Sequence, residues 1–285
     1  MSEPTHPYEV LDVFTDTPLE GNALAVFTQG ELIPSTLFQR IARELNLSET
    51  VFITPGDPSA GFDAEIRIFT PGAELPFAGH PTLGSAFVVA AILDLAVVRL
   101  KTQAGVVPVR MTREHGELTF GEMDQPIPRI EPHPDPQAVL AALGVSETLT
   151  PIVNYTNGTT HTVVVLGSGE AVAALDPDMG LLKASDVQAA VVALTGHGTA
   201  KTRNFAPRLG VPEDPATGSA AGPLALHLAL HGLIEFGEQI VISQGVEIGR
   251  PSTLHARVEG NASEPAPIVV GGSAVVVARG NFRFR

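Results

Sequence analysis

Three polar side chains, Glu49, His80 and Asp214, stand at positions where a proton can be moved or an anion held. Glu49 follows a helical segment and precedes an apolar run, and apolar surroundings raise the pKa of a carboxyl group toward the range useful for proton transfer. His80 and Asp214 open two related segments, His80–Ala86 and Asp214–Ala220, which share Pro, Gly, Ser and Ala at the same spacing. Each residue also has a purely structural interpretation, as an exposed glutamate, a buried histidine and a helix cap.

The two related segments predict a binding site made partly of backbone groups. Each is expected to run from a strand through a Pro-containing loop into Gly-Ser-Ala, which opens an apolar helix. Small residues at a helix start leave N–H groups accessible, and that helix end is partially positive, so a carboxylate can bind there. For one segment alone, Pro and Gly that only turn and cap the chain are the simpler interpretation. Together the segments favour a cleft for a small anion, with His80 and Asp214 as equivalent residues.

Other chemistries are disfavoured by the residue types. The chain has no Cys, which excludes thiol nucleophiles, thiolate metal sites and disulfides. Ser219 lies in Gly-Ser-Ala-Ala-Gly, not in the Gly-x-Ser-x-Gly turn of an α/β-hydrolase. His227 and His231 have the spacing of a metal pair, but without a third ligand a pair on a helix surface is favoured. Asn157 and His161 are weaker candidates for the cleft, because an Asn-Gly pair is typical of a hairpin turn. Neither a metal nor a cofactor is expected.

The elements that must position these residues are mostly strands. Runs of β-branched and aromatic residues predict the strands, and apolar residues at helical spacing predict the helices. The predicted strands are Tyr8–Phe14, Ala23–Phe27, Phe62–Phe69, Val106–Met111, Leu118–Met123, Thr162–Leu166, Gln239–Ile242, Leu254–Val258, Ile268–Val270 and Ala274–Ala278. The predicted helices are Ser35–Leu45, Thr82–Leu93, Gln137–Leu143, Ser185–Leu194 and Ala220–His231. Strand runs mixed with separate helices indicate an α+β fold.

The related segments also indicate a duplicated fold. His80 and Asp214 are 134 residues apart, close to half of the 285 residues. A second pair, Arg67-Ile-Phe-Thr-Pro71 and Arg203-Asn-Phe-Ala-Pro207, has nearly the same offset. Five prolines shortly before the middle of the chain predict an extended linker. The expected domains are 1–125 and 137–285, joined by a linker over 126–136, with the last strand able to return to the first domain.

Composition limits the partners. Asp and Glu number 31 against 17 Lys and Arg, and a net charge of −14 repels phosphate backbones and anionic lipid. Nucleic acid and membrane surfaces are therefore not expected as partners. The longest apolar stretch, near 86–100, is broken by Asp94 and is shorter than the roughly 20 residues of a membrane span. With no signal peptide visible and no Cys, a soluble cytoplasmic protein is expected.

At these residues the sequence resembles the phenazine-biosynthesis isomerase family (PhzF-like), within the diaminopimelate-epimerase-like fold. The matching stretches are Gly21–Phe27, Asn46–Thr50, Arg67–Pro71, Glu74–Thr82, Glu213–Gly222 and Gln244–Pro251, which run along nearly the whole chain. Ala23 departs from the family pattern, which has Pro after Gly-Asn, in a loop not expected to carry chemistry. The resemblance implies two pseudo-symmetric domains, each a mostly antiparallel sheet curled around a central helix, and a site to which both contribute.

The resemblance also implies roles for individual residues. The implied catalytic residues are Glu49, His80 and Asp214, and the implied substrate contacts are Ser48, Gly79, Thr217, Gly218 and Ser219. Glu49 would remove a ring proton and return one at another carbon, without a cofactor. His80 and Asp214 would hold the substrate's amine, hydroxyl and carboxylate groups, while Ser219 and backbone donors would hold the carboxylate. Epimerases of this fold use two Cys, so racemisation by paired thiols is disfavoured here.

The later motifs are most similar to family members of phenazine (antibiotic) biosynthesis. Those enzymes isomerise trans-2,3-dihydro-3-hydroxyanthranilate to an aminoketone, which implies a small anionic cyclic amino acid as substrate and a homodimer as the assembly. Two alternatives stay open. A related isomerase or epimerase acting on another amino or hydroxy acid would carry the same residues. A non-catalytic binding or scaffold protein would keep the fold without the chemistry, although the presence of Glu49 counts against it.

Overall fold

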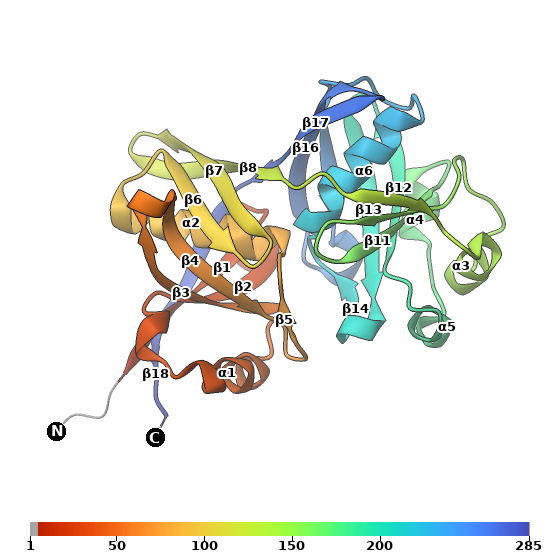
Figure 1. Cartoon of the computed structure of the whole chain (residues 1–285). Helices are drawn as coiled ribbons and strands as arrows, with labels where there is room; N and C mark the ends of the chain where they lie inside the picture. Colours follow the sequence, from red (N-terminus) through yellow and green to blue (C-terminus); the bar gives the residue numbers. More distant parts are fainter. Residues whose placement is uncertain (1–4, 285) are drawn as a thin grey trace. The chain divides into compact units, whose positions relative to one another are not determined.

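The computed structural model describes residues 5–284 and divides into two compact units (Figure 1). Unit 1 contains the described residues up to Met123 together with those from Gly271 onward. Unit 2 contains Asp124–Val270. Sheets and separate helices occur in both units, which is the predicted α+β fold. No helix in the described part of the chain is long and apolar enough to cross a membrane.

Unit 1 is a sheet packed around one buried helix. Its strands are β1 (His6–Val13), β2 (Asn22–Phe27), β3 (Glu49–Asp57), β4 (Phe62–Phe69), β5 (Glu74–Leu75), β6 (Val97–Thr102), β7 (Gly105–Glu114), most of β8 (Glu117–Gln125) and β18 (Ala274–Phe282). Its helices are α1 (Phe38–Leu45) and α2 (Gly79–Leu93). Every residue of α2 from Gly79 to Ala90 is buried, because the helix is apolar on all sides and contacts strands around its whole circumference.

Unit 2 repeats this plan. Its strands are β9 (Arg129–Pro132), β10 (Val153–Thr156), β11 (Thr160–Val165), β12 (Ala189–Gly196), β13 (Thr199–Ala206), β14 (Val211–Asp214), β15 (Gln239–Gln244), β16 (Ser252–Asn261) and most of β17 (Glu264–Gly272). Its helices are α3 (Pro136–Leu143), α4 (Gly169–Ala173), α5 (Met179–Ala184) and α6 (Gly218–Leu230). Residues Gly218–Ala229 of α6 are all buried, so α6 is the central helix of this unit.

Strand pairing supports the predicted duplication. In unit 1, β2 pairs parallel with β3, β3 antiparallel with β4, and β4 antiparallel with β5 but parallel with β6. In unit 2, β11, β12, β13, β14 and β15 repeat that sequence of directions step for step. The register aligns Thr50 with Phe69 in one unit and Ala189 with Phe205 in the other. Glu49 therefore corresponds to Gln188.

Two predictions about the elements differ from the structure. The predicted helix over Ser185–Leu194 is wrong, because α5 ends at Ala184 and β12 begins at Ala189. Its Ala-Ala-Val-Val-Ala run is buried throughout, and such a continuous apolar run has no alternation to separate a strand from a helix.

The proline-rich segment 126–136 is not a separate linker. It contains β9, which pairs with β10 of the same unit, and it ends where α3 begins. Pro136 is tolerated because the first helical position needs no N–H partner, and Asp135 caps the helix by accepting from the N–H of Ala138. At the other end of the chain, β18 pairs with β1 along eight residue pairs and belongs to unit 1.

Candidate active site

In unit 1 the fold brings Glu49 and His80 together. Glu49 is the first residue of β3, and the left-handed Asn46 (φ 52°) ends α1 just before it. His80 is the second residue of α2. The Nε2 atom of His80 lies 3.1 Å from Oε2 of Glu49, with the side chains 4% and 14% exposed. The carboxylate is therefore held near the surface of the unit against a buried ring, not in bulk solvent.

The His80 ring has a second partner that the sequence analysis did not single out. Its Nδ1 atom lies 3.3 Å from Nδ2 of Asn22, which is fully buried at the start of β2. Burial lowers the pKa of His80 to about 3, so the ring is uncharged at neutral pH. A neutral imidazole next to a carboxylate does not cancel the negative charge that a general base needs.

In unit 2 the polar residues gather around the start of α6. The hydroxyl of Thr217 donates to Oδ2 of Asp214 at 2.6 Å. Gln244 donates to the carbonyl of Asp214 at 2.8 Å and to Oγ1 of Thr217 at 2.9 Å, while its Oε1 accepts from the Thr217 N–H at 3.1 Å. Oγ of Ser219 lies 3.1 Å from Nε2 of His161. Burial lowers the pKa of His161 to about 4, so this ring is also neutral.

Asn157 replaces a hydrogen bond that α6 cannot make by itself. Pro223 lies inside this helix and has no N–H, so the carbonyl of Ser219, four residues earlier, loses its usual partner. The side-chain amide of Asn157 donates to that carbonyl at 3.0 Å. The hairpin formed by β10 and β11 thus contacts Ser219 twice, through Asn157 and His161.

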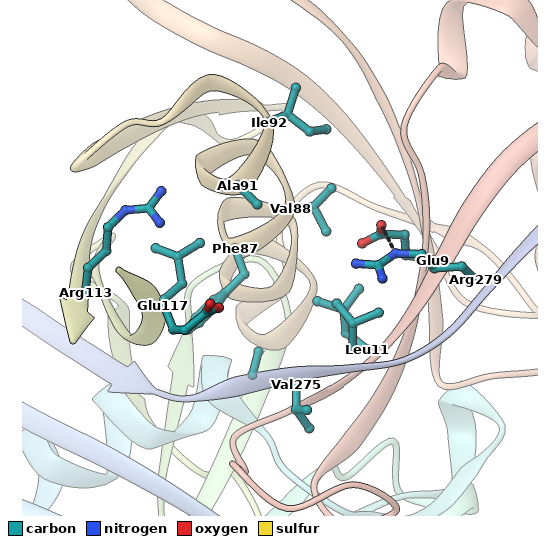
Figure 2. A pocket seen from close by; sticks show the side chains of 13 residues that line it. Glu9, Leu11, Phe87, Val88, Ala91, Ile92, Arg113, Glu117, Val275 and Arg279 are labelled. Atoms are coloured by element: carbon teal, nitrogen blue, oxygen red, sulfur yellow. Dashed lines mark hydrogen bonds and ion pairs between the residues drawn. The ribbon is translucent and has the colours of Figure 1, made fainter. Parts of the chain in front are cut away.

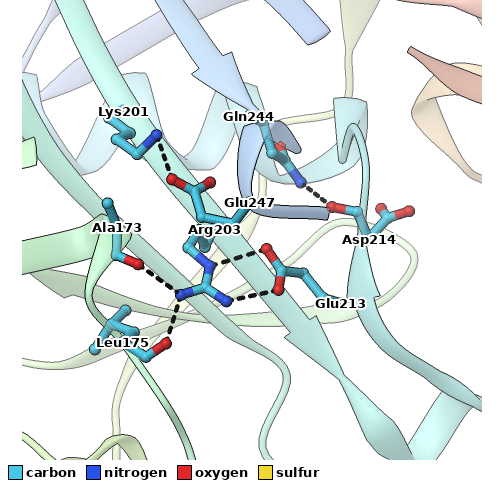
Figure 3. A network of polar contacts seen from close by, with 8 residues as sticks. All are labelled: Ala173, Leu175, Lys201, Arg203, Glu213, Asp214, Gln244 and Glu247. Atoms are coloured by element: carbon cyan, nitrogen blue, oxygen red, sulfur yellow. Dashed lines mark hydrogen bonds and ion pairs between the residues drawn. The ribbon is translucent and has the colours of Figure 1, made fainter. Parts of the chain in front are cut away.

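An arginine–glutamate pair fixes the strand that leads to Asp214 (Figure 3). Nε and Nη2 of Arg203 donate to the two carboxylate oxygens of Glu213 at 2.9 and 2.7 Å. Nη1 donates to the carbonyls of Ala173 and Leu175 at 3.2 and 2.6 Å. Lys201 pairs with Glu247 at 2.6 Å, as Figure 3 also shows. Both cations therefore have carboxylate partners: Arg203 joins β13 to β14, and Lys201 joins β13 to the segment that follows β15.

The starts of α2 and α6 correspond to each other, but the residues that match are not the ones that the sequence indicated. Arg67 forms the same two-pronged pair with Glu74, at 2.7 and 2.8 Å, six residues before His80. Glu213 likewise stands six residues before Ser219. Gly79 and Gly218 are the first residues of their helices, so His80 corresponds to Ser219, and the predicted equivalence of His80 with Asp214 is wrong.

The Gly-Ser-Ala sequence that both segments share explains why His80 was matched with Asp214. Gly218–Ala220 opens α6 as predicted, but Gly84–Ala86 lies in the second turn of α2. Asp214 instead ends β14 and corresponds to Leu75 at the end of β5. Of the other predicted contacts, Ser48 is half-buried next to Glu49, and Gly79 and Thr217 are buried at the helix starts. The residues that sequence reasoning underrated are Asn22, Gln244, Asn157 and His161.

The prediction that His227 and His231 both lie on a helix surface is wrong for His227, which is buried inside α6, whereas His231 is exposed just after the helix. His227 is fully buried, with Nε2 2.7 Å from Oγ1 of Thr150 and Nδ1 2.9 Å from the Tyr155 hydroxyl. Both of its ring nitrogens are thus used in hydrogen bonds, and burial lowers its pKa to about 3. Within residues 5–284, no group of three His, Asp or Glu side chains is placed to bind a metal ion.

Comparisons with known proteins identify the family. The phenazine biosynthesis-like protein family (PhzC-PhzF) matches residues 11–280. The chain belongs to this family. It is 47% identical over 276 residues to the trans-2,3-dihydro-3-hydroxyanthranilate isomerase of Pseudomonas chlororaphis, covering 96% of this chain and 98% of the relative. The relative of that name from Pseudomonas aeruginosa is 46% identical over 277 residues, with the same coverage.

The fold of this PhzF-family chain agrees with a solved structure. The crystal structure of the Bacillus anthracis phenazine biosynthesis protein, PhzF family, superposes with a TM-score of 0.86. It covers 99% of this chain and 100% of that chain at 22% identity. At that identity the likeness concerns the fold, and it agrees with the fold class that the sequence predicted.

Proposed function

We propose that this protein is an isomerase that converts trans-2,3-dihydro-3-hydroxyanthranilate to an aminoketone in phenazine biosynthesis, with Glu49 as its acid/base residue. The observation that carries the proposal is the Glu49 carboxylate, held 3.1 Å from the neutral ring of His80. It occurs in a chain that is 46% to 47% identical, over nearly its whole length, to Pseudomonas enzymes of that name.

The proposed reaction is a proton shift within the ring. Glu49 removes a proton from one ring carbon, and the electron pair left behind spreads over the conjugated double bonds beside the carboxylate. The same side chain then returns a proton at another carbon, so that no atom is gained or lost, and the enol formed becomes the ketone. A positioned acid/base contributes roughly 10²- to 10⁴-fold to such a step. Proton transfer of this kind needs no cofactor.

In unit 2, the start of α6 carries groups whose chemistry suits the charged groups of an amino acid. The Asp214 carboxylate suits the substrate's amine, and the Ser219 hydroxyl suits its carboxylate. The first-turn N–H groups of Gly218 and Ser219 have no acceptor within their own helix, and the helix end is partially positive. Gly79 offers the same type of donor at the start of α2. These donors also stabilise negative charge as it develops, typically by about 3 kcal/mol each.

The test is turnover and isotope exchange in heavy water. The wild-type protein is expected to consume trans-2,3-dihydro-3-hydroxyanthranilate and to place deuterium on a ring carbon, as followed by proton NMR. The variant Glu49→Gln keeps the shape of the side chain but cannot take a proton, and should lose at least about 10³-fold in rate. Glu44→Gln, on the exposed side of α1, is the matched control and should be unchanged. Turnover of Glu49→Gln within tenfold of the wild type rules the assignment out.

Two other outcomes identify the alternatives. If high concentrations of wild-type enzyme leave the substrate's spectrum unchanged, a related isomerase or epimerase acting on another amino or hydroxy acid is favoured. If a panel of such acids binds but exchanges no deuterium, the protein is a binding or scaffold protein. Both outcomes contradict the proposal.

We further propose that the protein acts as a cytoplasmic homodimer. The absence of Cys supports the cytoplasmic location, because a protein of the reducing cytoplasm does not depend on disulfides. Unit 1 offers a hollow of about 440 Å³ beside β18, in which Arg279 pairs with Glu9 at 2.8 Å (Figure 2). Ile92 and Val276 line it and are 62% and 36% exposed. Light scattering should give twice the chain mass of 29.8 kDa, and Ile92→Glu should shift it to a single chain. A monomeric wild type contradicts this proposal.

A further inference from the structure

His80 is a buried ring whose two nitrogens face partners of opposite hydrogen-bonding character. Nδ1 lies 3.3 Å from Nδ2 of Asn22, an amide nitrogen, which can only donate. Nε2 lies 3.1 Å from Oε2 of Glu49, and a carboxylate oxygen can only accept. The three side chains come from three different elements, β2, α2 and β3, and therefore form a chain of contacts that only the folded unit creates.

Both contacts require the same form of the ring. A neutral imidazole carries one N–H and one lone pair. Asn22 as a donor needs the lone pair on Nδ1, and Glu49 as an acceptor needs the hydrogen on Nε2. The contact between Nε2 and Oε2 of Glu49 does not have the geometry of a regular hydrogen bond. At 3.1 Å, however, an N–H still attracts a carboxylate oxygen, whereas a lone pair repels it.

We infer that Asn22 is a positioning residue that locks His80 in the tautomer with its hydrogen on Nε2, and that His80 in this form orients the Glu49 carboxylate. Because both ring nitrogens then contact the protein, His80 serves Glu49 instead of binding the substrate's amine or hydroxyl group. This differs from the role that the family resemblance implied for His80. The effect on rate rests on the proposed function, but the tautomer does not.

Close packing explains why these three residues meet. β2 and β3 pair in parallel, with Leu24 opposite Glu49. Asn22 stands two residues before Leu24, so it lies near the start of β3, where Glu49 is. α2 packs tightly on β2, since a Cβ added to Gly84 would lie 2.6 Å from Cδ2 of Leu24. A side chain at position 84 would have to displace Leu24 and Val13, so glycine there favours the close approach of α2 to β2. Asn22, the second residue of the Gly-Asn pair that opens β2, thus has a use in the site, although this segment was not expected to carry chemistry.

The test is the nitrogen NMR spectrum of the protein labelled with ¹⁵N-histidine, at pH 7.5 and without substrate. In the wild type, Nδ1 of His80 should have the shift of an unprotonated ring nitrogen and Nε2 that of a protonated one. The signals are assigned by their loss in His80→Gln. In Asn22→Asp the new carboxylate can only accept, so Nδ1 should become protonated. Asn261→Asp makes the same change at an exposed position and should leave the His80 signals unchanged.

Kinetics provide the second readout. Asn22→Asp should lower kcat about 10- to 100-fold and leave KM within about threefold, because the substrate groups are bound elsewhere. A wild-type spectrum with the proton on Nδ1 overturns the inference, and so does an Asn22→Asp spectrum identical to the wild type. If Asn22→Asp does not fold, the wild-type spectrum alone still decides. Inactive wild-type protein with the expected tautomer would contradict the proposed function and leave this inference standing.

Discussion

At the scale of single residues, the two units are alike in shape and unlike in chemistry. Glu49 corresponds in strand register to Gln188, whose side-chain amide has no group that can act as an acid or base near neutral pH. His80 corresponds to Ser219, and each is the second residue of a central helix. Of the two corresponding strand positions, only that of unit 1 therefore carries a side chain able to accept and return a proton, and it is the residue proposed for that role.

Ser219 provides a prediction at this scale. If its hydroxyl binds the substrate carboxylate, Ser219→Ala loses a hydrogen bond to a charged group, worth about 1.5–3 kcal/mol. We expect KM to rise roughly 10- to 100-fold, with a smaller change in kcat, in steady-state assays of the isomerisation. Ser185→Ala, at an exposed position after α5, should behave as the wild type. An unchanged KM for Ser219→Ala would remove this residue from the substrate site.

At the scale of elements, what positions the site is the path from β13 through β14 into α6. The Arg203–Glu213 pair joins the two strands, and Gln244 at the end of β15 then bonds to both Asp214 and Thr217. Gln244 is followed by Gly245, whose φ is +80°. The chain turns so tightly there that the loop after β15 lies against the segment leading into α6.

This turn gives a prediction with a built-in control. A Cβ on Gly245 would lie 2.2 Å from the carbonyl oxygen of Arg250 and 2.6 Å from that of Pro215. Gly249 has a similar φ of +71°, but nothing lies within 4 Å of its Cβ position. Gly249→Ala should therefore cost about 1 kcal/mol of unfolding free energy, and Gly245→Ala at least about 3 kcal/mol together with most of the activity. Urea unfolding measures both, and equal losses would contradict the role given to this turn.

At the scale of the whole molecule, three histidines are buried without charge. His80, His161 and His227 are each less than 5% exposed, and burial lowers their pKa values from 6.5 to about 3, 4 and 3. Such rings lower the unfolding free energy in acid, because the histidines of the unfolded chain bind protons that the buried rings cannot bind. The folded state is thus stabilised fully only above the ordinary histidine pKa.

The pH dependence of stability follows from this. Between pH 6.5 and pH 5, each buried histidine should lower the unfolding free energy by up to about 1.4 kcal/mol per pH unit. His227→Gln removes one of the three groups and should make the decline with falling pH shallower. His197→Gln, at a side chain that is 95% exposed, should leave the slope as in the wild type. Urea unfolding at a series of pH values measures these slopes, and equal slopes for wild type and His227→Gln would be inconsistent with a buried neutral ring.

The sequence by itself determined the features that depend on local patterns. Runs of β-branched and aromatic residues predicted many strands, repeated motifs predicted two related halves, and the family motifs placed Glu49, His80 and Ser219 among the site candidates. These features are readable because a motif encodes the backbone conformation of its own few residues. The run Ala189–Ala193 shows the limit, since local apolar content alone does not separate a buried strand from a helix.

Only the tertiary structure decided which residues act on one another. The contacts Asn22–His80 and His161–Ser219 each join residues 58 positions apart, and neither has a local signal. The equivalence of His80 with Ser219 likewise followed from where the two helices begin, and not from identical residues in the two segments. The physical reason is that such contacts depend on strand register and helix packing across the whole unit. Strand register and helix packing are set by the burial of the core residues, and not by the site residues that they bring together.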